Sequence, residues 1–144
     1  MAHYADRATY SYGAAPDSSL ICAGWLARGH SFRSASAPDG FLDRLAWRCV
    51  NQLERKYRGI HVCELCSPDE ADYVSILHRG RKTVLGMAEI TVRTKSGDYA
   101  PPSLNVHYVA AHGYLPPDDF VRAVLDVPET QALMDWSLFV GPYW

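Results

Sequence analysis

The sequence predicts an α+β domain, in which helices pack on a small antiparallel sheet. Two observations support this class. Some stretches repeat apolar residues at intervals of three and four, which is typical of helices with one buried face. Other short stretches are apolar or alternate between apolar and polar residues, and Gly, Ser or Asp residues separate them, which is typical of strands joined by tight turns. The two kinds of stretch follow one another along the whole chain.

The composition indicates one ordinary globular domain spanning residues 1–144, with 48% hydrophobic and 21% charged residues. Residues 1–18 are polar and rich in turn formers, so we expect an irregular N-terminal arm. The net charge of -2 gives no basic patch for nucleic acid, and no apolar run approaches the length of a membrane span. Because residues 1–6 do not resemble a secretory leader, we predict a cytoplasmic protein.

The first half of the chain predicts one strand and one long helix. Residues 20–26 form a short apolar run that predicts a buried strand. Ser36 stands three residues ahead of Asp39, a spacing that favours the start of a helix. Apolar residues then recur on one face over 41–57, and Gly59 is expected to end the helix in a left-handed conformation.

Three further strands are predicted over residues 73–77, 82–85 and 88–94, with tight turns at 78–81 and 96–98. In the third strand, polar residues alternate with apolar ones, which predicts one solvent-facing side. Glu89 lies on that side and is therefore expected to be a solvated carboxylate.

The last third of the chain predicts two helices and a tail. Residues 104–112 can form a short helix that Gly113 ends. A second helix is expected to open at Pro116–Asp119, where prolines precede carboxylates that the helix dipole favours. Residues 128–135 allow one or two more helical turns, and the aromatic tail over 136–144 is expected to pack against the domain.

Four residues supply the strongest chemical signal. Cys63 and Cys66 have the C-x-x-C spacing that lets one turn direct two sulfurs at one ion. His107 and His112 follow downstream with four residues between them, within the range that zinc fingers tolerate. Zinc takes four such ligands in a tetrahedron, so the sequence predicts a Zn²⁺ site. The order of cysteine turn, hairpin and helix predicts a core like that of a zinc finger.

The histidine spacing leaves the identity of one ligand undecided. Five residues advance a regular helix by roughly 500°, which places the two imidazoles about 140° apart around the axis. His107 and His112 can therefore share an ion only if the last helical turn loosens or tightens. His61 competes for a place among the ligands, because it shares one face of an extended segment with Cys63.

Two other interpretations of the cysteines stay open. A thioredoxin-like redox pair lies at the start of a helix, whereas Ser67 and Pro68 follow Cys66 without a long helical pattern. The cysteines and histidines can also be structural without any metal. Sequence patterns of zinc proteases, zinc deaminases, phosphate loops and dinucleotide sites are absent.

The predicted function is a structural zinc site in a cytoplasmic protein that binds another macromolecule or has an accessory or immunity-type role. Four side-chain ligands leave no position for an activated water. The alternative is a small zinc hydrolase or lyase with an open coordination position beside His61, Glu64 or Tyr108, where Glu64 or Glu89 carries protons. The partner we expect is a protein, not a nucleic acid or a membrane.

Four blocks of the chain are distinctive: Tyr10–Gly13, Gly24–Phe32, Gly59–Cys66 and His107–Phe120. They resemble blocks of a small bacterial family of uncharacterised proteins, and the resemblance extends to about Leu125. The histidine block is the most distinctive of the four. Ala27 stands where family members commonly have an acidic residue. The resemblance implies a shared fold unit and a metal site, without a known activity.

Overall fold

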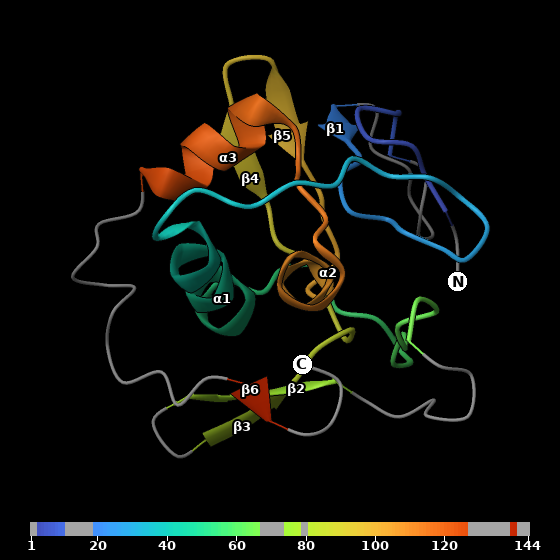
Figure 1. Cartoon of the computed structure of the whole chain (residues 1–144), viewed down its shortest axis with the longest axis vertical. Helices are drawn as coiled ribbons and strands as arrows, with labels where there is room; N and C mark the ends of the chain where they lie inside the picture. Colours follow the sequence, from blue (N-terminus) through green and yellow to red (C-terminus); the bar gives the residue numbers. More distant parts are fainter. Residues whose placement is uncertain (1–2, 11–18, 67–73, 79–80, 127–138, 141–144) are drawn as a thin grey trace.

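The computed structural model describes residues 3–10, 19–66, 74–78, 81–126 and 139–140, and it confirms the α+β class. Figure 1 shows its helices and strands. They are β1 (Leu20–Ile21), α1 (Phe41–Asn51), β2 (Ser75–His78), β3 (Arg81–Val84), β4 (Val92–Thr94), β5 (Gly97–Tyr99), α2 (Asn105–His112), α3 (Asp118–Leu125) and β6 (Phe139–Val140).

The strands form two separate three-stranded sheets. One has the order β1–β5–β4, in which β4 and β5 are antiparallel and β1 runs parallel to β5. The other has the order β3–β2–β6 and is antiparallel throughout. Figure 1 shows α1 and α2 between the two sheets, with α3 against the β4–β5 hairpin. The main apolar core therefore lies around α1 and α2, which contribute Phe41, Leu45 and Tyr108 to it.

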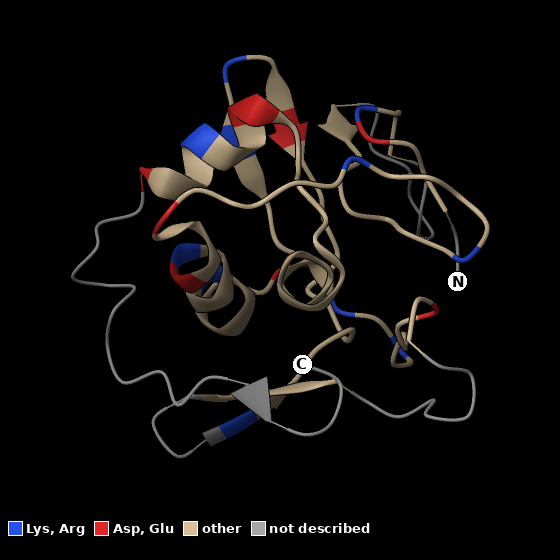
Figure 2. Cartoon of the chain, viewed as in Figure 1, with Lys and Arg blue, Asp and Glu red and all other residues tan. Residues whose placement is uncertain are grey.

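Several local predictions are confirmed. The hairpin expected at 78–81 joins β2 to β3, and the hairpin at 96–98 joins β4 to β5. α2 ends at His112, and Gly113 follows in the left-handed conformation with φ 69°. Acidic residues open α3, as Figure 2 shows in red. The helical turns expected over 128–135 lie outside the described residues, as does the tail over 136–144 except for β6, which pairs with β2.

The long helix predicted to start at the Ser36–Asp39 signal and to continue through residue 57 is wrong in both its start and its end. α1 begins after Gly40, and no side chain caps its first turn. It stops at Asn51, because the following backbone finds other partners. The amide of Glu54 donates to the carbonyl of Glu89, and the amide of Tyr57 donates to the carbonyl of Met87. These long-range hydrogen bonds replace those of a longer helix.

The predicted strand over 20–26 is also too long, since only Leu20 and Ile21 belong to β1. The next residues remain buried but lie outside the strand, and Gly24 among them has a φ of 71°. In the arm expected over 1–18, residues 3–10 have no regular strand or helix, as predicted. Their ties to the rest of the chain include bridges to Trp25 and Ile21.

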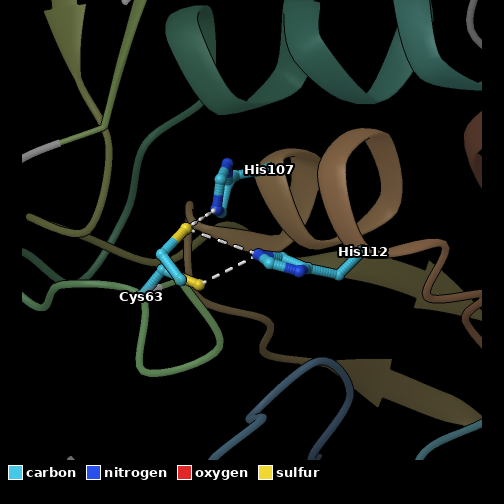
Figure 3. A group of neighbouring side chains, drawn as sticks. Cys63, His107 and His112 are labelled. Carbon is cyan, nitrogen blue, oxygen red and sulfur yellow. Dashed lines mark hydrogen bonds between the residues drawn. The ribbon is translucent and has the colours of Figure 1, made fainter. Parts of the chain in front are cut away.

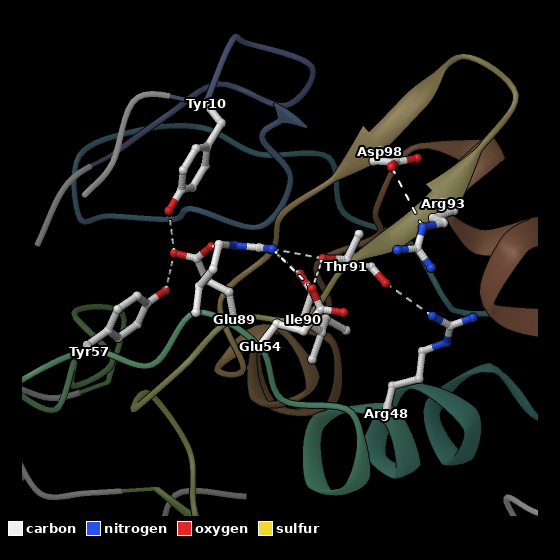
Figure 4. A network of polar contacts seen from close by, with 10 residues as sticks. Tyr10, Arg48, Glu54, Tyr57, Glu89, Ile90, Thr91, Arg93 and Asp98 are labelled. Carbon is white, nitrogen blue, oxygen red and sulfur yellow. Dashed lines mark hydrogen bonds and ion pairs between the residues drawn. The ribbon is translucent and has the colours of Figure 1, made fainter. Parts of the chain in front are cut away.

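The prediction that Glu89 is solvent-exposed is wrong, because its side chain is completely buried. Figure 4 shows the carboxylate facing the Tyr10 and Tyr57 hydroxyls. Strand β4 begins only at Val92, so residue 89 lies outside it. The alternation of inward and outward side chains along a strand therefore does not apply to Glu89. One oxygen of the Glu89 carboxylate accepts hydrogen bonds from the Tyr10 and Tyr57 hydroxyls, at 2.7 and 2.9 Å. The other accepts from Arg55 Nε at 2.6 Å. A buried carboxylate needs such partners, and two distant segments supply them, one with Tyr10 and one with Arg55 and Tyr57.

Within the described part of the chain, no helix has both the length and the apolar character needed to cross a lipid bilayer.

Candidate metal centre

The cysteine turn is held in place by backbone contacts on both sides. The amide of His61 donates to the carbonyl of Gly86 at 2.9 Å. Gly86 has a φ of 91°, and a Cβ built there would lie 2.2 Å from the His61 carbonyl oxygen. On the outer side, Arg28 Nη2 donates to the carbonyl of Glu64 at 2.7 Å. These contacts fix the position of the turn that carries Cys63 and Cys66.

The histidine helix is anchored to the same glycine. The Ser103 hydroxyl accepts a hydrogen bond from the amide of Gly86 at 2.8 Å, directly before α2 begins. Most of the first five residues of α2 are fully buried, including His107. Gly86 therefore contacts both the cysteine turn and the start of the histidine helix, although it lies far from both along the chain.

The end of α2 solves the spacing problem of the two histidines. The amide of Gly113 donates to the carbonyl of Tyr108, five residues earlier, where a regular α-helix would use the residue four earlier. This wider closing turn is the loosening that the histidine spacing requires. The two imidazole rings consequently approach each other, with centroids 5.0 Å apart and planes at 81°.

All four predicted ligands meet at one point, and they form a group that could hold a metal ion (Figure 3). One ligand atom from each residue takes part, and these atoms all lie within 4.8 Å of one another. The Sγ atom of Cys63 is 3.4 Å from His112 Nε2. The Sγ atom of Cys66 is 3.4 Å from His107 Nε2 and 3.5 Å from His112 Nε2. Cys63 and His107 are buried, while Cys66 and His112 are partly exposed.

Burial sets the protonation of these groups in the metal-free protein. It raises the pKa of Cys63 to about 12, although the amides of Cys66 and Leu65 donate to its sulfur and act in the opposite direction. Burial, together with the nearby His112, lowers the pKa of His107 to about 4. Burial also lowers the pKa of His112. Both imidazoles are therefore neutral at pH 7, the form in which histidine binds metals.

His61, the competing ligand, does not belong to this group of four. Its ring stacks on Tyr57 with a centroid distance of 4.7 Å, and it meets the edge of Trp25 at 6.4 Å. The backbone of His61 therefore positions the cysteine turn, while its side chain packs with aromatic residues.

The sequence pattern did not reveal the residues that hold the centre together. Gly86, Ser103 and Arg28 contact the cysteine turn or the histidine helix, but none is a metal ligand type at a recognisable spacing. The one signal available was a single glycine directly after the predicted strand over 82–85. A single glycine can indicate that another segment approaches the backbone closely, but it does not identify that segment.

A family model described as a domain of unknown function, DUF7919, matches residues 2–125. No curated protein matches the chain. No solved structure matches it either. The matched residues include β1 to α3 and all four residues of the candidate metal centre. The chain therefore belongs to the DUF7919 family.

Proposed function

We propose that this protein binds one Zn²⁺ ion through Cys63, Cys66, His107 and His112, and that the ion is structural. The observation that carries the proposal is the convergence of two thiols and two imidazoles from separate segments. Two cysteines and two histidines are a common ligand set of structural zinc sites. The ion would join the cysteine turn to the end of α2 and would contribute directly to folding stability.

The distances support a tetrahedral site. Typical Zn–S and Zn–N bonds of about 2.3 and 2.0–2.1 Å place sulfur and nitrogen ligands roughly 3.5 Å apart in a tetrahedron. Three of the sulfur–nitrogen pairs lie at 3.4, 3.4 and 3.5 Å. The same four side chains therefore need little rearrangement to take up the ion.

The number of ligands favours a structural role over a catalytic one. A catalytic zinc ion usually has three protein ligands and an open position for water. Four side chains converge here, and His61 packs elsewhere, so the alternative zinc enzyme has less support. We propose that the zinc-stabilised domain acts by binding another protein, in an accessory or immunity-type role.

We also propose a cytoplasmic location. The four cysteines of the chain all lie within the described residues, and each has a free thiol. Reduced thiols and a thiolate metal site are typical of a reducing compartment.

Elemental analysis tests the zinc proposal directly. The purified protein is expected to contain one zinc per chain. Cys63→Ser and His107→Ala are each expected to lose most of it, whereas the matched controls Cys49→Ala and His61→Ala retain it. Cys49 is a buried thiol outside the group of four. Unchanged zinc content in Cys63→Ser and His107→Ala would refute the proposal.

X-ray absorption at the zinc edge separates the structural site from the enzyme. The structural site predicts two sulfur and two nitrogen ligands and no bound water. Three protein ligands with one water-derived oxygen would instead support the zinc enzyme. A protein that copurifies without metal and forms a Cys63–Cys66 disulfide under mild oxidation would support the redox interpretation.

A further inference from the structure

A pocket lies beside the Gly24–Phe32 block, and none of the four candidate metal ligands lines it. The N-terminal arm, the segment after Trp25 and Pro117 line an open pocket of about 460 Å³. This volume falls in the range of small-molecule sites. Its walls combine apolar and charged side chains. The lining includes Tyr4, Asp6, Arg7, Leu26, Phe32 and Arg33.

Asp6 supplies the negative charge of the pocket. Its Oδ1 atom accepts hydrogen bonds from the amide of Gly24 at 3.1 Å and from the Tyr114 hydroxyl at 3.0 Å. Its Oδ2 atom accepts from the same hydroxyl at 2.9 Å. A carboxylate has about four acceptor positions, so Oδ2 retains capacity for a further donor. These contacts also fix the carboxylate in place, because Gly24 and Tyr114 belong to the buried part of the fold.

The Asp6 side chain is partly buried. Burial is the main influence on its pKa and raises it, although Gly24, Tyr114, Arg33 and His3 act in the opposite direction. A cationic donor beside the carboxylate would compensate for this burial. An ammonium group is such a donor, and it is small enough to approach Oδ2 directly.

Two arginines supply the positive charge of the same pocket. Arg33 pairs with Asp118, and the two side chains are 45% and 69% exposed. Arg7 lies 3.7 Å from Asp119, and the Arg7 side chain is 63% exposed. Such exposed ion pairs are weak, and a guanidinium has five donors. A ligand carboxylate can therefore share Arg33 with Asp118 or replace that contact.

The backbone at Arg7 is unusual. Among the described residues, Arg7 is the one non-glycine residue with positive φ, at 70°. This conformation is unfavourable for a residue that carries a Cβ atom. Its amide donates to the carbonyl of Cys22 at 2.7 Å, which holds the turn in this conformation. Strained residues of this kind cluster at binding sites, where they fix the direction of a side chain.

We propose that this pocket binds a free α-amino acid with an apolar or aromatic side chain. Its ammonium group would donate to Asp6, its carboxylate would pair with Arg33 and Arg7, and its side chain would contact Leu26 and Phe32. A pocket lined by one carboxylate and two guanidinium groups matches a zwitterion better than a simple anion or cation. The site uses no residue of the metal centre and does not depend on the zinc proposal.

Three probes with the same aromatic body test the charge requirement. L-Phenylalanine carries both charges, phenylacetate carries the negative one and phenethylamine carries the positive one. Each is titrated into the full-length protein while amide chemical shifts are followed, with the Gly24 amide as reporter because it donates to Asp6. L-Phenylalanine is expected to bind at least about tenfold more tightly than either single-charge probe, because it alone makes both charge-assisted contacts. L-Leucine is expected to bind as well.

Variants identify the groups responsible. Arg33→Gln is expected to weaken L-phenylalanine binding by at least about tenfold while leaving phenethylamine binding unchanged. Arg33 is half-exposed, so this change should not disturb folding. Arg122→Gln removes an exposed arginine from α3, outside the lining of this pocket, and should leave binding unchanged. Phenylacetate binding as tightly as L-phenylalanine, an unaltered affinity in Arg33→Gln, or no shift with either amino acid would each overturn the proposal.

Discussion

The carbonyl oxygen of His61 lies where a side chain on Gly86 would have to begin. A Cβ at position 86 would be 2.2 Å from that oxygen, and the φ of 91° is itself unfavourable for any other residue. Gly86→Ala is therefore expected to lower the free energy of unfolding by about 2–5 kcal/mol, from backbone strain and overpacking together. Urea unfolding of the zinc-loaded protein measures this change. Zinc affinity should fall as well, because the contact positions the cysteine turn.

Gly29 provides a matched control for that substitution. It has a similar φ of 86°, but a Cβ there would meet nothing within 4 Å. Gly29→Ala should therefore show the backbone cost alone, about 1–2 kcal/mol. Equal losses at the two positions would show that the close approach to His61 contributes nothing.

A conservative substitution of the buried Glu89 is expected to cause a large loss of stability. Glu89→Gln keeps the shape of the side chain but removes the charge that pairs with Arg55. We expect a loss of about 2–4 kcal/mol in the free energy of unfolding, because the partly buried Arg55 would lose the charge of its buried partner. Tyr10→Phe, which removes one hydrogen bond to the same carboxylate, should cost about 1.5–3 kcal/mol.

The exposed pair of Arg93 and Asp98 is the control for this experiment. Its atoms lie 3.8 Å apart, and the side chains are 78% and 40% exposed. Asp98→Asn should change the free energy of unfolding by less than about 0.5 kcal/mol. A loss of that small size in Glu89→Gln would contradict the role of Glu89 as a buried anchor.

Metal removal should destabilise the protein only when all four ligands are present. A ligand present at 1,000 times its dissociation constant stabilises the folded state by about 4 kcal/mol. Adding a chelator is therefore expected to lower the melting temperature of the wild type, and adding zinc should restore it. Cys66→Ser should already melt at the lower temperature and should respond little to either addition. Identical responses of the two proteins would contradict metal binding at this cluster.

Asp6 predicts a specific dependence of stability on pH. Because burial raises its pKa above the ordinary 3.8, the folded protein holds this proton more tightly than the unfolded chain does. The resulting stabilisation is fully present below pH 3.8 and is lost as the pH rises through the higher folded value. The wild type should therefore lose stability relative to Asp6→Asn across that interval. Urea unfolding of both proteins at a series of pH values measures the difference, and metal release at acid pH contributes equally to both.

Asp118 should show the opposite sign. Its hydrogen bond and ion pair with Arg33 lower its pKa below 3.8, so its contribution is present above that pH and is lost as the pH falls. Asp118→Asn should therefore remove a contribution to stability that falls as the pH falls, whereas the contribution of Asp6 falls as the pH rises. The same slope in both variants would contradict the assignment for Asp6.

The cluster of four candidate ligands could be predicted from the sequence because residue type and spacing carry the chemistry. Cys63 and Cys66 share one turn, and His107 and His112 share one helix, so each pair is a local pattern. The hairpins and the last two helices were likewise set by nearby turn and capping residues.

What could not be predicted depends on partners far along the chain. α1 ends early because residues after Asn51 bond to the segment around Glu89. Glu89 is buried because Tyr10, Arg55 and Tyr57 supply donors from other segments. Alternation within a strand contains no information about those donors, and it predicted the wrong environment for this carboxylate.

The placement of the four ligands has a consequence for the unfolded chain. The contact between Cys66 and His107 spans 41 residues, and both hairpins lie between them. A bound ion would act there as a reversible cross-link, comparable to a disulfide but controlled by metal supply. The entropic cost of closing a loop rises slowly, by about 0.6 kcal/mol for each doubling of its length. The turn between β4 and β5 should therefore tolerate added residues without loss of the cross-link.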